Sequence, residues 1–189
     1  MQQSEQQSSR KLFFKTARAF FLGHIGGVII AFIFCFGLSG LFEGNGIFAL
    51  IPVVLFVYSY PIYGTMWNAG HRDLNAANFG HTQLHRWKGL VYGLVGMIPV
   101  ILISLGFILS KFGLFFNFVM PYKIINSEIW PIINLINTSV YLPEFTYGQV
   151  FLIAACSLIP VLIGEFGYLM GTYDISIKQK MIYRNEKKD

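Results

Sequence analysis

Four long apolar runs dominate the sequence and limit what the chain can fold into. They cover about residues 19–42, 47–69, 89–110 and 150–171. Each is long enough to cross the hydrocarbon core of a bilayer as a helix, which takes about 20 residues. Charged residues make up only 12% of the chain, too few to cover the surface of a soluble globule. The sequence therefore predicts a single all-α integral membrane domain, residues 1–189, with four transmembrane helices.

The positions of Lys and Arg predict how the four spans are oriented. Apart from Lys111 and Lys123, all of the 14 Lys and Arg residues lie before the first span, in the loop over residues 70–88, or after the fourth span. Basic residues gather on the cytoplasmic side of membrane proteins. We therefore predict a multi-pass protein of the cell membrane whose termini and 70–88 loop are all cytoplasmic.

Residues 119–148 then form an outer interfacial segment. Within it Ile129, Ile132, Ile133 and Ile136 repeat at helical spacing. This pattern is typical of a short helix lying on the outer membrane surface.

A short recurring pattern raises the alternative that the spans are two related helical hairpins. A basic residue followed by glycines five and eight positions later opens the first span, at Arg18, and the third span, at Lys88. The tripeptide Ile-Pro-Val occurs in the second and fourth spans but also in the third, so apolar composition alone explains it as well. An internal repeat therefore stays open.

The composition also bears on partners and source. The net charge is +5, but the basic residues flank the apolar runs and form no separate basic region. Anionic lipid headgroups explain this placement, so we expect a lipid bilayer and no nucleic acid as partner. Heavy use of Phe, Ile, Asn and Lys is typical of AT-rich bacterial genomes, so we expect a bacterial membrane.

Small residues recur along several spans at intervals of four, the spacing that lets helices approach closely in lipid. The helix-packing candidates are Gly23, Gly27, Ala31, Gly89, Gly93, Gly167 and Gly171. We favour packing within one chain, and a homo-oligomer or larger membrane complex is the alternative.

Two ionisable side chains, His24 and Glu165, lie inside the predicted spans. A lone ionisable group in hydrocarbon costs several kcal/mol unless it is paired or hydrated. Because the first and fourth spans run in opposite directions, both residues are about six positions from the cytoplasmic edge. We predict that they form an intramembrane polar pair, and local hydrogen bonding of each is the alternative.

The 70–88 loop holds three of the four histidines. His81 and His85 are four residues apart, as metal ligands on one helix face are, but a third ligand is missing and we favour a solvated loop. Residues 71–78, HRDLNAAN, match the catalytic-loop pattern of protein kinases without the other kinase motifs, so we treat the match as coincidence. We expect Asp73 to cap a short loop helix or to bond backbone between the hairpins.

No motif in the chain defines a catalytic or cofactor site, and we expect no cofactor. The prediction is a non-catalytic accessory, scaffold or assembly subunit of a membrane complex. The alternative is a small transporter or channel subunit that uses His24 and Glu165, and an enzyme that uses the histidine loop comes third.

Overall fold

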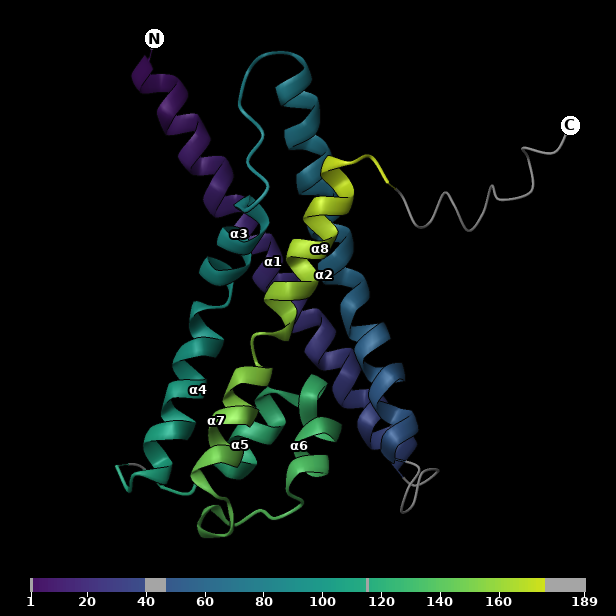
Figure 1. The fold of residues 1–189 in the computed structure, drawn as a ribbon, viewed down its shortest axis with the longest axis vertical. Coiled ribbons are helices and arrows are strands. Elements are labelled where there is room, and N and C mark those ends of the chain that lie inside the picture. Colours follow the sequence, from purple (N-terminus) through teal and green to yellow (C-terminus); the bar gives the residue numbers. More distant parts are fainter. Residues whose placement is uncertain (1, 40–46, 115, 176–189) are drawn as a thin grey trace, which may run out of the picture.

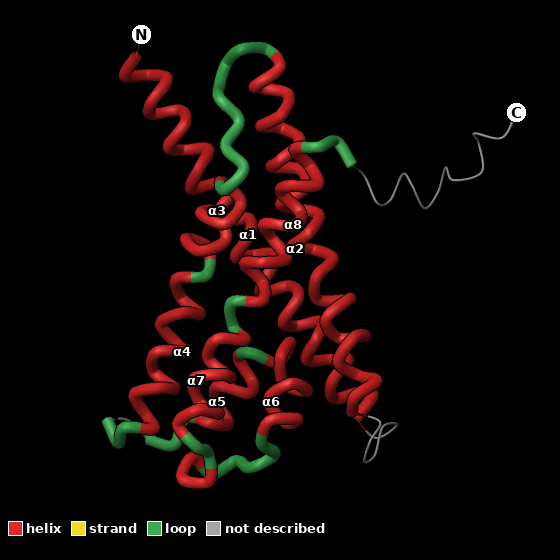
Figure 2. Tube along the Cα trace, in the orientation of Figure 1, coloured by secondary structure: helices red, strands yellow, loops and turns green. Residues whose placement is uncertain are grey.

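The structure is a computed structural model that describes residues 2–39, 47–114 and 116–175. All regular secondary structure in these ranges is helical (Figure 2), which confirms the predicted all-α class. Residues 40–42 of the first predicted span and the basic tail after residue 175 lie outside the described ranges. The longer helices are α1 (Gln2–Ser39), α2 (Ile47–Asn78), α3 (Lys88–Gly96), α4 (Ile98–Lys111), α7 (Tyr147–Cys156) and α8 (Ile159–Thr172).

Three helical stretches in the described ranges are long and apolar enough to cross a membrane: Arg10–Leu38, Ala49–Asn78 and Tyr147–Thr172. The pair α3 and α4 makes a fourth if its two parts, between which the helix axis bends by 60°, form one span. The bend falls at Met97, just before Pro99. Proline lacks an amide donor and clashes with the preceding turn, which explains a break at this position. Pro160 likewise follows the break between α7 and α8.

Helix α2 is longer than predicted, because it continues through Asn78 into the segment expected to be a loop. The extension packs against α8 (Figure 1). A Cβ added at Gly70 would collide with the backbone of α8, and one added at Gly171 would lie 2.8 Å from the His71 amide nitrogen. The two backbones therefore pass at a distance that only glycine permits, and this packing holds a polar stretch of α2 in helical form.

The chain between α4 and α7 is built from short helices and turns. It forms α5 (Val119–Ile125), the 3-10 turn η2 (Ser127–Ile129), α6 (Trp130–Ile136) and the 3-10 turn η3 (Leu142–Glu144). The helix predicted near Ile136 is present as α6. The segment folds back beside α7 and against α1 and α2 (Figure 1), and Ile129 and Ile133 face protein.

The turn of this hairpin, residues 126–129, is named here the tip. All four tip residues are at most 2% exposed. Ser127 Oγ donates to the Val28 carbonyl at 3.0 Å, and Cys35 Sγ donates to the Ser127 carbonyl at 3.6 Å. The tip is therefore attached to α1 well inside its long apolar stretch.

Candidate functional site

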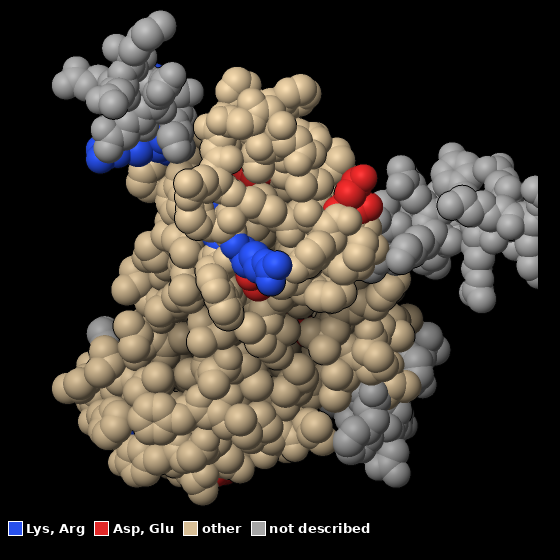
Figure 3. Space-filling view, turned by 45° about the horizontal axis from the view of Figure 1, so that its top comes forward, with Lys and Arg blue, Asp and Glu red and all other residues tan. Residues whose placement is uncertain are grey.

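Two buried polar regions that contain acidic side chains stand out in the part of the chain that the structure describes. On the face drawn in Figure 3, acidic and basic side chains lie mostly in the upper half, and much of the surface below carries none. The first region, the Asp73 cluster, joins α1, α2, α3 and α8. The second surrounds the tip and includes His24 and Tyr58.

The Asp73 cluster is fully connected. Asp73 is 5% exposed, and its Oδ2 accepts hydrogen bonds from Lys88 Nζ at 2.6 Å and from the Tyr168 hydroxyl at 3.1 Å. Arg72 lies 3.3 Å from Oδ1 and donates to Thr16 Oγ1 at 3.2 Å. A carboxylate with this many donors is well compensated for burial, so the cluster fastens four helices together. Asp73 therefore lies within α2, and its hydrogen bonds are made to side chains. It does not cap a separate loop helix, as the sequence had suggested.

Glu165 belongs to α8, and its side chain lies beside this cluster, next to the first turn of α3. Its carboxyl group interacts with the Leu90 amide, and a Cβ at Gly89 would collide with it. A carboxylate is favoured at the first turn of a helix, where backbone amides are unpaired. Glu165 Oε2 has no hydrogen-bond partner among the described residues.

His24 has a different partner. Its Nδ1 is 2.6 Å from the Tyr58 hydroxyl, and its ring stacks on Phe21. The interactions described for His24 and Glu165 do not join the two side chains. The predicted pair therefore gains no support from the contacts, and local bonding of each residue accounts for the geometry.

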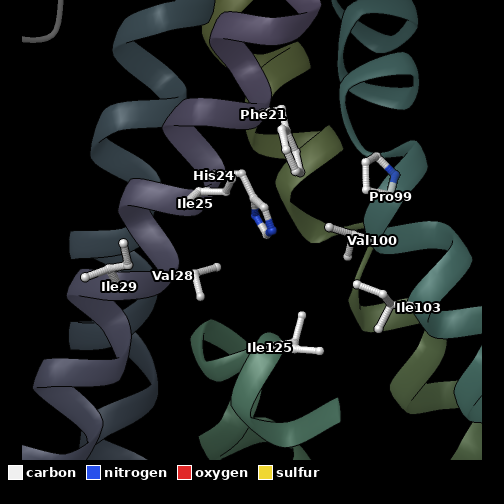
Figure 4. Close-up of a pocket in the computed structure, with 9 residues that line it drawn as sticks. All are labelled: Phe21, His24, Ile25, Val28, Ile29, Pro99, Val100, Ile103 and Ile125. Atoms are coloured by element: carbon white, nitrogen blue, oxygen red, sulfur yellow. The ribbon is translucent and has the colours of Figure 1, made fainter. Parts of the chain in front are cut away.

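His24 also lines a cavity of about 210 Å³ between α1 and α4 (Figure 4). The end of α5 closes one side of this cavity through Ile125. The other lining residues are Phe21, Ile25, Val28, Ile29, Pro99, Val100 and Ile103. His24 is the one polar side chain of the nine, so the cavity is apolar with a single hydrogen-bonding ring in its wall.

The tip holds the acid that sequence reasoning missed. Glu128 is fully buried, and neither of its carboxyl oxygens has a hydrogen-bond partner in the described part of the chain. The Oδ1 atom of Asn126 is likewise unpartnered. The Tyr58 hydroxyl and the Cys35 thiol both lie near the Glu128 carboxyl group. In the sequence, Glu128 follows the polar residues Asn126 and Ser127 within a run of isoleucines, and this pattern was the available signal. The segment is too short to be recognised as a membrane span.

The predicted small residues face neighbouring helices. A Cβ at Gly27 would lie 2.7 Å from the Tyr58 ring, and one at Gly167 would lie 2.8 Å from the Tyr63 carbonyl. At Gly23 the nearest atom would be 3.6 Å away, an ordinary contact. Ala31 is fully buried, and Gly89 and Gly93 pack against Glu165 and Val161 of α8.

His81 and His85 do not share a helix face. Both are exposed in the connection between α2 and α3, outside either helix. Among the residues that the structure describes, no group of three His, Cys, Asp or Glu side chains is arranged to hold a metal ion. The metal candidates therefore gain nothing from the geometry.

Comparison with known proteins finds no protein-family model that matches the chain and no similar curated protein or solved structure.

Proposed function

We propose that the chain crosses a bacterial cell membrane four times, by α1, α2, the bent pair α3 and α4, and the pair α7 and α8. Both termini and the connection between α2 and α3 are then cytoplasmic. The start of α1, this connection and the end of α8 lie at one end of the molecule (Figure 1). Of the nine Lys and Arg residues that the structure describes, all but Lys111 and Lys123 belong to these segments or lie near them in the chain, and this supports the orientation.

In this arrangement the hairpin of α5, η2 and α6 enters the membrane without crossing it. The contact of the tip with Val28 supports this depth, because Val28 lies near the middle of the apolar stretch of α1. Irregular backbone at membrane depth is tolerated where protein surrounds it. The burial of all four tip residues meets that condition.

The function that this geometry supports best is that of a small transporter or channel subunit. The observation that carries the proposal is Glu128, a buried and unpartnered carboxyl group at the end of a re-entrant hairpin. Ionisable groups inside membranes are expensive, and they mark ion or solute pathways. Broken helices are also typical of transporters, and the α3 and α4 pair is broken at Met97.

The second candidate is a non-catalytic accessory or assembly subunit. It is favoured by the first part of α1, which projects from the bundle (Figure 1) with Leu12 and Phe14 exposed beside Lys11 and Lys15. Such a helix offers apolar and basic contacts to a partner at the membrane surface.

Flux measurements on the purified chain in liposomes test the two candidates. The transporter proposal expects ion or solute flux from the chain alone, measured as charge movement across a panel of ion gradients. Absence of flux, together with enrichment of a defined partner at fixed stoichiometry after mild detergent extraction, would favour the accessory subunit.

Labelling of single cysteines tests the topology separately. Residues 75–80 should react from the cytoplasmic side and residues 137–143 from the other side. Labelling of residues 75–80 from outside would contradict the orientation.

A further inference from the structure

We propose that Glu128 is a proton-binding site inside the membrane and that the proton it holds is the ion coupled to transport. This inference deepens the proposed function and rests on it. At rest the Glu128 side chain is a neutral carboxylic acid at the tip.

The surroundings of Glu128 do not compensate a negative charge. No other residue donates to either carboxyl oxygen in the described part of the chain, although the side chain is completely buried; the one backbone amide that acts on the carboxyl group is its own. Removing an ionised carboxylate from water costs many kcal/mol unless donors or a cation replace the water. Taking up a proton avoids this cost.

The titratable groups near Glu128 are Cys35 of α1, Tyr58 of α2 and Tyr122 of α5. Basic groups on the same helices include His24 of α1 and Lys123 of α5. Cysteine and tyrosine are neutral near pH 7. Helix α6 contains no titratable side chain.

The single lysine of the hairpin is directed elsewhere. Lys123 Nζ donates to Asn134 Oδ1 at 2.9 Å and to the carbonyls of Thr138 and Ser139 at 3.3 and 2.9 Å. These oxygens satisfy all three of its donors. The other of these two basic groups, the His24 ring, is itself buried, and its Nδ1 lies 2.6 Å from the Tyr58 hydroxyl.

A proton fits this site better than a metal cation does. Hard cations take about six oxygen ligands, whereas the tip offers the two carboxyl oxygens and Asn126 Oδ1 as unpartnered oxygens. Ser127 Oγ is already bonded to Val28, and the Ser127 carbonyl accepts from Cys35. A proton needs only one of the carboxyl oxygens.

Infrared spectroscopy of the full chain in lipid nanodiscs tests the site directly. At pH 7 the wild type should show the carbonyl band of a buried carboxylic acid. Glu128→Gln should abolish this band, Glu128→Asp should shift it, and Glu165→Gln, the matched change at the other buried glutamate, should leave it in place. Gel filtration checks that each variant is folded.

Two results would overturn the site: a band that survives Glu128→Gln, or a Glu128 that is ionised at pH 7. Loss of the band on adding Na⁺ at constant pH would replace the proton by a cation. Proton-coupled flux in liposomes that persists in Glu128→Gln would remove the coupling role and leave transport standing. If the band is confirmed but no ion flux is found, the proton-binding site is supported and the transport function is contradicted.

Discussion

Asp73 and Glu128 are both buried carboxyl groups, but their surroundings are opposite. Asp73 receives hydrogen bonds from Lys88, Arg72 and Tyr168, whereas Glu128 receives none from the described residues. A buried acid with several donors contributes to holding helices in place, and a buried acid without donors reduces the stability of the fold. Burial alone therefore does not distinguish the two acids. The absence of donors from other residues is what leads us to propose a role for Glu128.

The largest expected effect concerns the helix contact that assembles the Asp73 cluster. Gly171→Leu places a side chain between α8 and the α2 backbone, where the Trp67 carbonyl and the His71 amide leave no space. Neither backbone can yield without separating the helices, so we expect a loss of about 3 kcal/mol or more. Thermal unfolding in detergent measures it. Gly106→Leu on α4, where nothing lies within 4 Å, is the control and should change little.

Removing the acid of the cluster comes next. Asp73→Ala leaves the Tyr168 hydroxyl without its acceptor in an almost fully buried position, and it leaves Lys88 half-buried without a counter-ion. We expect a loss of about 2 kcal/mol, since Lys88 and Arg72 retain some access to water.

The control for Asp73→Ala is Asp174→Ala. The Asp174 side chain is 67% exposed and pairs with His71 at 3.1 Å. An exposed ion pair contributes at most about 1 kcal/mol. Equal losses in the two variants would mean that the Asp73 cluster is no more than a surface ion pair.

The same contrast explains how far sequence reasoning reached. Apolar runs predict spans because lipid accepts them directly, and the long helices agree with those runs. The extension of α2 was not predictable from its polar residues, because the close contact of Gly70 with α8 and the bonds of Asp73 stabilise it. Residue spacing placed His24 and Glu165 at similar depth, but it could not show which helix each side chain faces.

The tip shows the limit most clearly. Its position depends on contacts with α1, more than 90 residues away in sequence, and apolar periodicity carries no information about such contacts. The isoleucines indicated a helix, and α6 is that helix. Packing decides whether those isoleucines face lipid or protein. The sequence alone therefore predicted a surface segment that includes Glu128.

A smaller effect is expected where the tip is bonded to α1. Ser127→Ala removes the hydrogen bond to the Val28 carbonyl, which in a helix already accepts a backbone amide. We expect a loss of about 1 kcal/mol in the same unfolding measurement. Thr82→Ala, an exposed hydroxyl that bonds to the Gln83 carbonyl, should change stability by much less. Equal effects would indicate that the tip does not depend on this contact.

The smallest effect on stability is expected at Glu128 itself. The sign of the change shows whether Glu128 is neutral, ionised or hydrogen-bonded, and so whether it differs from Asp73. Glu128→Gln preserves the shape of the side chain and breaks no hydrogen bond among the described residues, so the free energy of unfolding at pH 7 should change by less than about 0.5 kcal/mol. This expectation holds only for a protonated Glu128. If the carboxyl group were ionised and unpaired, glutamine would remove a buried charge and stabilise the protein by several kcal/mol. If a donor were bonded to it, glutamine would destabilise the protein as Asp73→Ala does. Glu144→Gln at an exposed position gives the baseline, and unfolding of the three proteins at pH 7 separates the outcomes.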